Sequence, residues 1–440
     1  GVEISYEEEL RGIKGIKFIQ KDRFNRDVGS FKNGELDIIP IAGKDLTITI
    51  DSELQDYGEQ LMNGKKGGIV AIDPRNGEIL SLVSAPSYNP NLLIGRNRSE
   101  NYMELYRDSI YKPLIDKSLL NMHAPGSPFK ILVGLSALQE NVISEKTSIF
   151  CNNYYQYGRE KRTMQCHCGG GHRNLTNAIS LSCNSYFANA YRKTIDTKSP
   201  TKEAFNNWSN QMKSFGLGEY LNNDLSVGKK GIIPDFEFYN KWYPDFKWGA
   251  TTTLSNSIGQ GEVLVTPIQL ANMTAAIANK GYYYTPHIIK KIEGSEIDSK
   301  FKTKNYTLID STHFEPIIEG LSKVYKSGTA QFLQVPEIEI CGKTGTAENF
   351  TKINGKKTQL TDHSIFVAFA PKDNPTIAIS VLVENGYYGS RWAGRIASLM
   401  IEKYIKGEVT LKNMEQLVMN KSLDEEYQKP FLNKPFKINQ

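Results

Sequence analysis

A helix that is apolar on nearly every side is the strongest constraint on the fold of this chain. The segment from Lys130 to Leu138 places apolar residues around the whole circumference of a predicted helix: Ile131, Leu132, Val133, Leu135, Ala137 and Leu138. Other elements must cover such a helix on all sides, so it belongs inside the protein. The chain has 440 residues, which is long enough to bury a large core around it.

The other periodic segments follow the order strands, helices, strands and a final helix. Two apolar runs flank Asp73-Pro74-Arg75-Asn76-Gly77, a turn sequence typical of a β-hairpin. The predicted elements are strands at 44–51, 69–72 and 79–83, helices at 53–62, 177–193, 202–215, 267–280 and 313–326, strands at 339–343, 364–370 and 376–384, and a helix at 392–405. This order predicts an α+β domain in which distant segments complete one sheet and a helical region is inserted in the middle.

The two ends of the chain lack this periodicity. Residues 1–44 are rich in Gly, Lys, Arg and Asp, and residues 408–440 are charged and contain two prolines. We therefore expect a domain at 45–407 with an N-terminal appendage and a C-terminal tail. No run approaches the roughly 18 apolar residues of a membrane-spanning helix. The chain begins at Gly1 without a Met, as expected of an ectodomain cut from a longer, anchored protein.

The charge distribution argues against a nucleic-acid partner. The formal net charge is +5, from 53 Lys and Arg residues against 48 Asp and Glu residues. These charges are interspersed and do not form a basic stripe, which is typical of a solvated surface.

Ser127 and Lys130 form a candidate nucleophile and base at the start of the apolar helix. Ser127 is followed by Pro128, and a Ser N-cap before a Pro is a favoured helix start. Residues three apart share a helix face, so the hydroxyl and the amine can approach hydrogen-bond distance. Burial lowers the pKa of a Lys, and a neutral amine can take the proton of a Ser nucleophile. The alternative is an ordinary capped helix with Lys130 on its surface. This alternative is disfavoured because a helix that is apolar on all sides has no face exposed to solvent.

Two further polar motifs suit the same chemistry. Ser182-Cys183-Asn184 interrupts a helical pattern, and its hydroxyl and amide suit proton transfer and peptide binding. Lys343-Thr344-Gly345-Thr346 lies on a predicted strand, where the Lys and the hydroxyls suit a carboxylate and Gly345 lets a substrate backbone approach. We expect the charge of Lys343 to lower the pKa of Lys130. A similar tetrad, Lys326-Ser327-Gly328-Thr329, ends a helix and is rejected for that reason.

Four of the five cysteines are clustered in the sequence, at Cys151, Cys166, Cys168 and Cys183. The spacing Cys-x-Cys-x-x-x-His, which ends at His172 and encloses three glycines, could wrap around a tetrahedral Zn²⁺. One or two disulfides and free buried thiols are the alternatives. The fifth cysteine, Cys341, lies on a predicted strand and is expected to be a small core residue.

The three polar motifs in this order resemble the signature of the penicillin-recognising serine enzymes. The likeness covers about residues 1–405 and includes GVEISYEEELRGIKG at 1–15, IVAIDPRNGEILSLVSAPSYNP at 69–90, SIGQGEVLVTPIQLA at 257–271 and DHSIFVAFAPKDNPTIAISVLVENG at 362–386. These segments are similar to the penicillin-binding protein 2 family, the class B peptidoglycan transpeptidases of cell elongation. The resemblance implies a five-stranded antiparallel sheet flanked by helices, an inserted all-helical subdomain at about 115–270, and a truncated pedestal remnant at 1–44.

The resemblance also implies a role for each candidate residue. Ser127 attacks the carbonyl between the two terminal D-alanines of a peptidoglycan stem peptide, and Lys130 takes its proton. An amine from a neighbouring stem then resolves the acyl-enzyme into a 4→3 crosslink, whereas β-lactam antibiotics leave Ser127 blocked. Backbone N–H groups of Ser127 and Thr346 form the oxyanion hole. Proton return, substrate orientation and binding of the terminal carboxylate are assigned to Ser182, Asn184, Lys343, Thr344, Gly345 and Thr346.

The resemblance implies no catalytic cofactor, but it does imply a structural zinc ion. Some members of this family carry zinc near this place, and the implied ligands here are Cys151, Cys166, His172 and Cys183, with Cys168 and His167 in reserve. Because Cys183 lies between Ser182 and Asn184, such a metal would brace the active site.

The resemblance implies membrane partners and a location. The partners are a glycan polymerase of the shape, elongation, division and sporulation (SEDS) type and a rod-shape scaffold protein. The location is the periplasmic face of the bacterial inner membrane, through an N-terminal anchoring helix absent from this chain. The rival interpretations are a D,D-carboxypeptidase or β-lactamase-like hydrolase, which would shorten the lifetime of the acyl-enzyme, and a non-catalytic β-lactam sensor or scaffold, which would tolerate Ser127→Ala.

Overall fold

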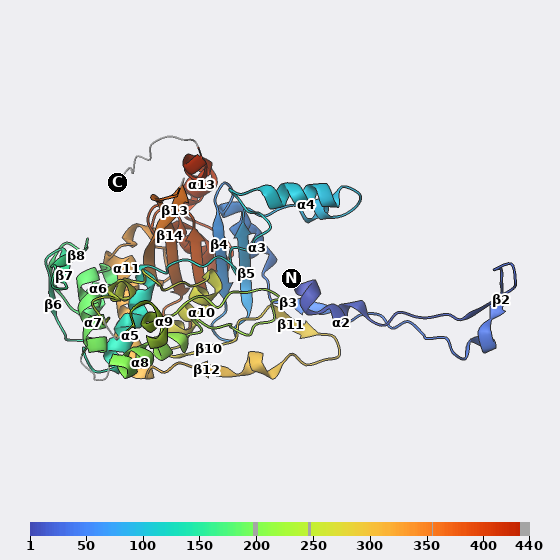
Figure 1. Cartoon of the computed structure of the whole chain (residues 1–440), viewed down its shortest axis with the longest axis horizontal. Helices are drawn as coiled ribbons and strands as arrows, with labels where there is room; N and C mark the ends of the chain where they lie inside the picture. Colours follow the sequence, from blue (N-terminus) through green and yellow to red (C-terminus); the bar gives the residue numbers. More distant parts are fainter. Residues whose placement is uncertain (197–200, 245–247, 354, 432–440) are drawn as a thin grey trace.

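The computed structural model describes residues 1–196, 201–244, 248–353 and 355–431, which form one body with a long N-terminal arm (Figure 1). The α-helices are α1 (Val2–Ser5), α2 (Glu7–Arg11), α3 (Ser52–Leu61), α4 (Arg98–Arg107), α5 (Lys130–Gln139), α6 (Leu175–Ser180), α7 (Asn184–Asp196), α8 (Thr201–Lys213), α9 (Phe236–Trp242), α10 (Pro267–Ala278), α11 (Phe314–Ser327), α12 (Ala393–Lys406), α13 (Lys412–Met419) and α14 (Asp424–Gln428). The strands are β1 (Ile19–Lys21), β2 (Asp27–Ser30), β3 (Leu46–Ile48), β4 (Gly67–Ile72), β5 (Ile79–Ala85), β6 (Ile149–Cys151), β7 (Tyr154–Tyr157), β8 (Arg162–Gln165), β9 (Gly171–Arg173), β10 (Tyr282–Tyr284), β11 (Ile289–Ile292), β12 (Lys304–Tyr306), β13 (Cys341–Ile353), β14 (Lys356–Ala370) and β15 (Ile377–Val383).

A five-stranded antiparallel sheet forms the centre of the body. Its strand order is β13-β14-β15-β4-β5, so two distant segments of the chain meet where β15 pairs with β4. The hairpin β4–β5 follows the predicted turn, because Asp73 accepts backbone hydrogen bonds across it. The sheet implied by the resemblance is therefore confirmed. β13 lies at one edge, which leaves its outer side open to the segment that contains Ser127.

Helices cover both faces of this sheet. Ile69 and Val83 are cross-strand partners on one face, which α3 and α12 cover. Val70 points to the opposite face, where it packs with Ile268 and Ala271 of α10. Because successive residues of a strand point to opposite faces, strands that are buried on both sides read as continuous apolar runs.

The apolar helix at Lys130 is α5, and nine of its ten residues are buried, as its sequence demands. It packs against α6, α7 and α8 of the inserted region and against α11, which follows that region in the sequence (Figure 1). That region is not entirely helical, because it also contains the two-stranded sheets β6–β9 and β7–β8. The helix predicted at 177–193 is two helices, α6 and α7, with Ser182 and Cys183 in the turn between them.

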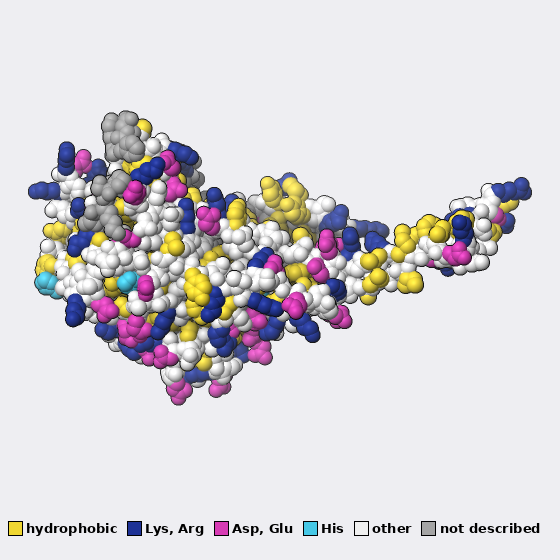
Figure 2. Space-filling view, turned by 90° about the horizontal axis from the view of Figure 1, so that it is seen from below, with side chains coloured by type: hydrophobic (Ala, Val, Ile, Leu, Met, Phe, Trp, Pro, Cys, Tyr) yellow, Lys and Arg dark blue, Asp and Glu magenta, His cyan; other side chains and the backbone are white. Residues whose placement is uncertain are grey.

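The two ends of the chain behave differently. The N-terminal arm extends away from the body and carries exposed apolar side chains along its length (Figures 1 and 2), among them Ile13, Ile16, Phe18, Ile38 and Ile39. The segment predicted as a C-terminal tail contains α13 and α14, which bury Val418 and Tyr427 against the body. Residues 432–440 of that prediction lie outside the described residues.

Within the described ranges, no helix combines the length and the apolar composition that crossing a bilayer requires.

Candidate active site

Ser127 lies where the chain turns into the buried helix. It begins a single 3₁₀ turn, Ser127–Phe129, that leads directly into α5. The expected N-cap is therefore displaced: Gly126 occupies the cap position, and the Ser127 hydroxyl makes no capping hydrogen bond. Gly126 has a φ of 61°, and a Cβ there would meet the carbonyl oxygen of Thr346 at 2.5 Å. The close approach of this loop to β13 thus requires a glycine at position 126. Because Ser127 does not cap the helix, its hydroxyl can face the other side chains of the site.

Three of the predicted catalytic side chains form one hydrogen-bonded chain. Ser182 Oγ donates to Ser127 Oγ at 3.0 Å and accepts from Lys130 Nζ at 3.0 Å. Lys130 also donates to the Ser182 carbonyl at 2.8 Å and to Asn184 Oδ1 at 2.5 Å. The structure therefore brings together the first two predicted motifs, although Lys130 reaches Ser127 through the Ser182 hydroxyl.

The turn between α6 and α7 holds Ser182 in a constrained backbone. Its φ is 56°, a left-handed value that costs a residue with a Cβ about 1–3 kcal/mol. The next residues fix the turn: Asn184 donates its amide Nδ2 to the Gln165 carbonyl at 2.6 Å, and its backbone N–H to Cys166 Sγ at 3.1 Å. The end of β8 and the adjacent Cys166 therefore fix the orientation of the Ser182-Cys183-Asn184 turn.

The third motif lies on the open edge strand β13. Lys343 is fully buried and donates to the carbonyl and the hydroxyl of Thr344 at 3.2 and 3.4 Å. A Cβ at Gly345 would approach Pro128 Cδ at 2.6 Å. The glycine is therefore required by the packing of the nucleophile turn against the strand, and not only by the approach of a substrate backbone. Thr346 completes the motif beside Gly126.

Burial sets the protonation of the two lysines. It lowers the pKa of Lys130 to about 8, and neighbouring thiols partly oppose this shift. Burial and then the charge of Lys130 lower the pKa of Lys343 well below its ordinary value. The repulsion between these two side chains that the sequence predicts is therefore present in the structure. At neutral to mildly alkaline pH, Lys130 can thus act as a base.

Two residues outside the predicted motifs also contact the site. Thr329, from the rejected tetrad, shares a 2.9 Å hydrogen bond with the Thr344 hydroxyl. Gln260 Nε2 donates to the Thr346 carbonyl at 3.1 Å, and the adjacent Gly259 carbonyl accepts from Gly126 N–H at 2.8 Å. The sequence of the rejected tetrad could have pointed to Thr329. Gln260 lies in the segment 257–271 that carries part of the resemblance, although no role was predicted for it.

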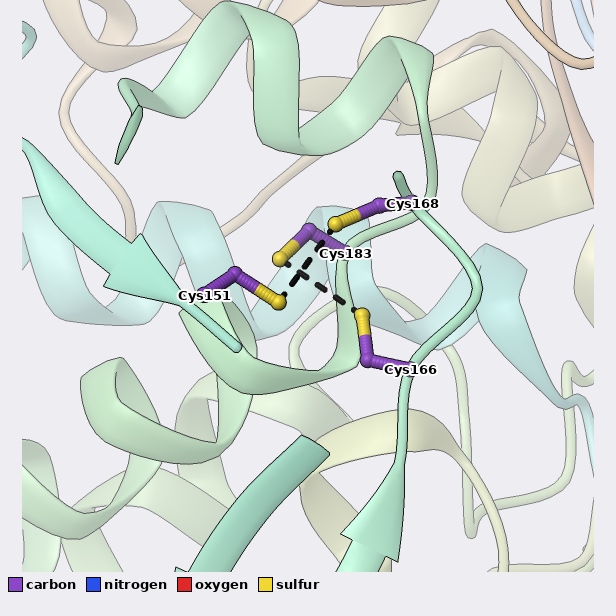
Figure 3. Close-up of side chains that lie close together, drawn as sticks. All are labelled: Cys151, Cys166, Cys168 and Cys183. Carbon is purple, nitrogen blue, oxygen red and sulfur yellow. Dashed lines mark hydrogen bonds between the residues drawn. The ribbon is translucent and has the colours of Figure 1, made fainter. Parts of the chain in front are cut away.

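Four cysteines meet directly behind the second motif (Figure 3). Their Sγ atoms all lie within 4.8 Å of one another, and all four side chains are buried: Cys151, Cys166, Cys168 and Cys183. The separations are 3.7 Å between Cys166 and Cys183 and 3.5 Å between Cys168 and Cys151. A hydrogen bond from Cys183 lowers the pKa of Cys166, which favours a thiolate in this cluster.

The predicted ligand His172 does not belong to this cluster. On β9 it pairs with Phe150 of β6, whereas Gly171 pairs with Cys151. Because neighbouring residues of a strand point to opposite faces, the His172 ring turns outward, where it packs on Phe150 and lies 3.3 Å from Ser148 Oγ. The reserve Cys168 takes its place, and the reserve His167 is exposed.

The geometry of the four thiols fits a metal. Tetrahedral zinc with Zn–S bonds of about 2.3 Å holds its sulfurs about 3.8 Å apart, close to the separations in this cluster. Four thiolates leave no open position for a substrate, so a metal here would be structural. Cys341 is buried on β13, outside the cluster, and its Sγ faces the Ile318 carbonyl.

This combination of a Ser-x-x-Lys helix start, a Ser-x-Asn turn and a Lys-Thr-Gly edge strand defines a penicillin-recognising serine enzyme fold. The chain belongs to the penicillin-binding protein transpeptidase family, since residues 67–402 match the family described as Penicillin binding protein transpeptidase domain.

Its relatives agree with the resemblance to the penicillin-binding protein 2 family. Peptidoglycan D,D-transpeptidase MrdA of Acinetobacter baumannii is 34% identical over 406 residues, which are 88% of this chain but only 57% of that protein. The crystal structure of Pseudomonas aeruginosa PBP2 in complex with WCK 5153 is 33% identical, with a TM-score of 0.73 over 85% of this chain and 79% of that chain. The complex between PBP2 and MreC from Helicobacter pylori is 27% identical, with a TM-score of 0.75 over 93% of this chain and 72% of that one.

Proposed function

We propose that this protein is a peptidoglycan D,D-transpeptidase that crosslinks stem peptides through an acyl-enzyme on Ser127. The observation that carries the proposal is the chain of hydrogen bonds from Ser127 through Ser182 to the buried Lys130. A Ser hydroxyl becomes a competent nucleophile when a base of lowered pKa can take its proton. A relative that spans most of this chain is named a peptidoglycan D,D-transpeptidase.

The acylation step follows from this geometry. Ser127 Oγ attacks the carbonyl carbon between two D-alanines, and its proton passes through Ser182 to the neutral Lys130. The carbonyl oxygen becomes negative between the N–H groups of Ser127 and Thr346. The C–N bond then breaks, and the proton returns through Ser182 to the leaving amine of D-alanine. The donor carboxylate lies near Thr344 and the buried Lys343.

An amine completes the reaction. It attacks the ester carbonyl of Ser127, forms a new amide bond, and gives its proton back to the same relay, so that Ser127 and Lys130 regain their starting states. Asn184 is held by Lys130 and by the Gln165 carbonyl, so its amide is positioned beside the donor peptide.

Mass spectrometry with a labelled penicillin tests the proposal. One adduct on Ser127 that persists for hours, and that Ser127→Ala abolishes, supports the acyl-enzyme of a transpeptidase. An adduct that is lost within seconds would favour a β-lactamase-like hydrolase. An adduct on another residue would contradict the assignment of the nucleophile.

We also propose a structural Zn²⁺ on Cys151, Cys166, Cys168 and Cys183. Their mutual distances, their burial and the lowered pKa of Cys166 support this ligand set. The Cys166 sulfur accepts from Asn184 N–H, so the cluster supports the turn that carries Ser182. The expected result is one zinc per chain, counted by native mass spectrometry, and free thiols or disulfides without metal would contradict it.

For the location and partners, we propose the periplasmic face of the inner membrane, a SEDS-type glycan polymerase and a rod-shape scaffold protein. The complex of a PBP2 relative with MreC supports a scaffold partner. The exposed apolar residues of the N-terminal arm provide a surface for such contacts. Pull-down of the scaffold by this chain, and its loss when the arm residues Ile13 and Phe18 are replaced by Ser, would support this assignment.

A further inference from the structure

A cavity of about 340 Å³ lies between the start of α12 and the segment that joins α13 to α14. One wall is formed by residues 387–395 and the other by residues 417–426, beside α13 at the top of the body (Figure 1). The residues assigned above to catalysis and to the cysteine cluster do not line it. This cavity is therefore separate from the candidate active site.

Three cationic side chains line the cavity: Arg391, Arg395 and Lys421. Arg391 and Arg395 are half-buried, and in the part of the chain that the structure describes none of the three cations forms an ion pair. Burial lowers the pKa of Arg395, and the charge of Arg391 lowers it further. The two guanidinium groups thus repel each other, and an anion between them would stabilise both.

Both arginine side chains are held in place by aromatic rings. The Arg391 guanidinium lies over the Tyr387 ring, 3.9 Å from its centroid, and that of Arg395 lies 5.3 Å from the Phe332 centroid. Arg395 Nη1 also donates to the Arg391 carbonyl at 2.5 Å. They flank the start of the 14-residue helix α12, where the helix dipole favours a negative charge. A ligand would therefore meet cations that are already ordered.

The indole of Trp392 adds an unused donor to the same wall. Trp392 lines the cavity, its side chain is only 5% exposed, and its Nε1 has no hydrogen-bond partner among the described residues. Lys65 Nζ lies 5.4 Å from the ring centroid, but this ammonium is also a donor, and its own hydrogen bonds go to backbone carbonyls. Buried polar groups are nearly always hydrogen-bonded, so this N–H indicates an acceptor supplied by a ligand.

The acidic residues of the cavity do not neutralise these cations. Glu426 accepts from the Tyr387 hydroxyl at 2.5 Å, from the Thr361 hydroxyl at 2.8 Å and from Lys429, so its oxygens are occupied. Glu425 is exposed and is the other carboxylate that lines the cavity. Three cations against this one carboxylate leave an excess of two positive charges, which calls for a ligand with two negative charges.

The directions of the donors favour a phosphate over a carboxylate. Arg391, Arg395 and the Trp392 N–H come from one wall, whereas Lys421 comes from the opposite wall. A carboxylate is planar and its two oxygens match a single guanidinium. A phosphate monoester offers three oxygens in different directions and carries a charge of about −1.5 to −2 at neutral pH, which matches the excess charge.

We infer that this cavity is a binding site for a phosphate group that carries two negative charges. Arg391, Arg395 and Lys421 bind its oxygens, and Trp392 Nε1 donates to one of them. Leu417 and Leu423, which also line the cavity, contact the carbon part of an organic phosphate. The inference goes beyond the proposed function, because it does not depend on acylation of Ser127.

The loop that carries Arg391 packs behind the third motif of the active site. A Cβ at Gly389 would meet the backbone N and O of Gly345 at 2.6 Å. Ser364 Oγ donates to the Tyr388 carbonyl at 2.9 Å, and Ser364 pairs with Thr346 across the sheet. An occupied phosphate site would therefore order a loop that supports β13.

Calorimetric titration of the full chain tests the inference. The probes are inorganic phosphate, inorganic pyrophosphate and malonate, which is a dicarboxylate of similar size to pyrophosphate. We expect one site per chain for phosphate and pyrophosphate, and binding of malonate that is weaker by about tenfold. Hydrogen exchange should slow in residues 387–395 and 417–426 when pyrophosphate is bound, which locates the site.

Variants of the wall separate specific binding from general attraction. Arg391→Gln and Arg395→Gln should each weaken pyrophosphate binding by about tenfold, as expected for the loss of a hydrogen bond between charged groups. Trp392→Phe keeps the ring but lacks the N–H, and should weaken binding by about fivefold. Arg98→Gln is the matched control, because Arg98 is exposed on α4 and does not line the cavity, and it should bind normally. Thermal unfolding checks that each variant is folded.

Vesicles distinguish the source of the phosphate group. Binding of the chain to phosphatidic acid vesicles but not to phosphatidylcholine vesicles, with loss of binding in Arg391→Gln, would assign the site to a lipid headgroup. Binding of inorganic phosphate and pyrophosphate without vesicle binding would assign it to a soluble phosphate.

Three results would each overturn the inference. They are the absence of phosphate and pyrophosphate binding, equal binding of malonate, and equal loss of affinity in Arg98→Gln and Arg391→Gln.

Discussion

The hydroxyl of Ser182 accepts a 3.0 Å hydrogen bond from Lys130 Nζ. The same hydroxyl donates to Ser127 Oγ at 3.0 Å. When Lys130 is neutral, both hydrogen bonds can reverse, and the proton of Ser127 then has a path to the lysine through one intervening oxygen. A general base normally acts on the proton it contacts directly or through one bridging group. In this resting arrangement Ser182 is that bridge.

Removing the bridge should therefore slow acylation. We expect Ser182→Ala to lower the rate of penicillin acylation by about 100-fold, the lower end of the range for general acid–base groups. Stopped-flow competition with a fluorescent penicillin measures this rate. Ser182→Gly also lacks the hydroxyl but relieves the left-handed backbone at φ 56°, so it should be equally slow yet about 1 kcal/mol more stable than the Ala variant. A Gly variant that acylates at the original rate would show that the backbone, and not the hydroxyl, matters.

The pH dependence of acylation should report Lys130. Only its neutral amine can accept a proton, and burial lowers its pKa to about 8. The rate should therefore increase as pH rises from about 6, reach half of its maximum near pH 8, and level off above about pH 9. Lys130→Arg should abolish acylation at every pH, because a guanidinium stays protonated. A rate that does not change between pH 6 and 9, with the fold intact by circular dichroism, would contradict the role of Lys130 as base.

The parts of the site that lie close together on one helix could be predicted from the sequence. Ser127 and Lys130 are three residues apart at a helix start, and the apolar helix after them required burial of Lys130. Separations of that kind are fixed by local geometry. The three motifs then met because the turn before α7 and the edge strand β13 both pack against this helix start.

Contacts that depend on strand register could not be read from the sequence. By their spacing in the sequence, His172 and Cys168 could each have been the fourth metal ligand. The pairing of β9 with β6 points His172 away from the other cysteines. A shift of one residue exchanges the two faces of a strand, and no local pattern in so short a strand determines it. Gln260 contacts Thr346 through a loop 86 positions away in sequence, which no periodicity encodes.

Removal of the metal should test the revised ligand set. We expect Cys168→Ala to lose zinc and to unfold at a lower temperature, because the remaining three thiols cannot complete a tetrahedral site. His172→Ala is the control and should keep one zinc per chain, since its ring lies outside the cluster. Native mass spectrometry counts the metal. Loss of zinc from the His172 variant would restore that residue as a ligand.

Chelation should also affect the active site. Asn184 N–H is bonded to Cys166 Sγ, so release of the metal should loosen the turn that carries Ser182. We expect a strong zinc chelator to lower the rate of penicillin acylation without modifying Ser127, and added zinc to restore it. An unchanged acylation rate in metal-free protein would contradict the bracing role.

The C-terminal helix α14 should contribute directly to the stability of the body. The Tyr427 hydroxyl accepts from Lys66 N–H at 2.8 Å and donates to the Glu384 carbonyl at 3.1 Å, so it joins the start of β4 to the end of β15. Tyr427→Phe would leave the buried Glu384 carbonyl and the partly buried Lys66 N–H without this partner, at a cost of about 1–3 kcal/mol for the buried carbonyl. Denaturant unfolding should show this loss, whereas Tyr220→Phe, at a ring that is 61% exposed, should leave the unfolding free energy unchanged. Equal stability of the two variants would mean that the Tyr427 hydroxyl does not stabilise this junction, and that the other contacts of Glu426 and Asp424 hold α14 in place.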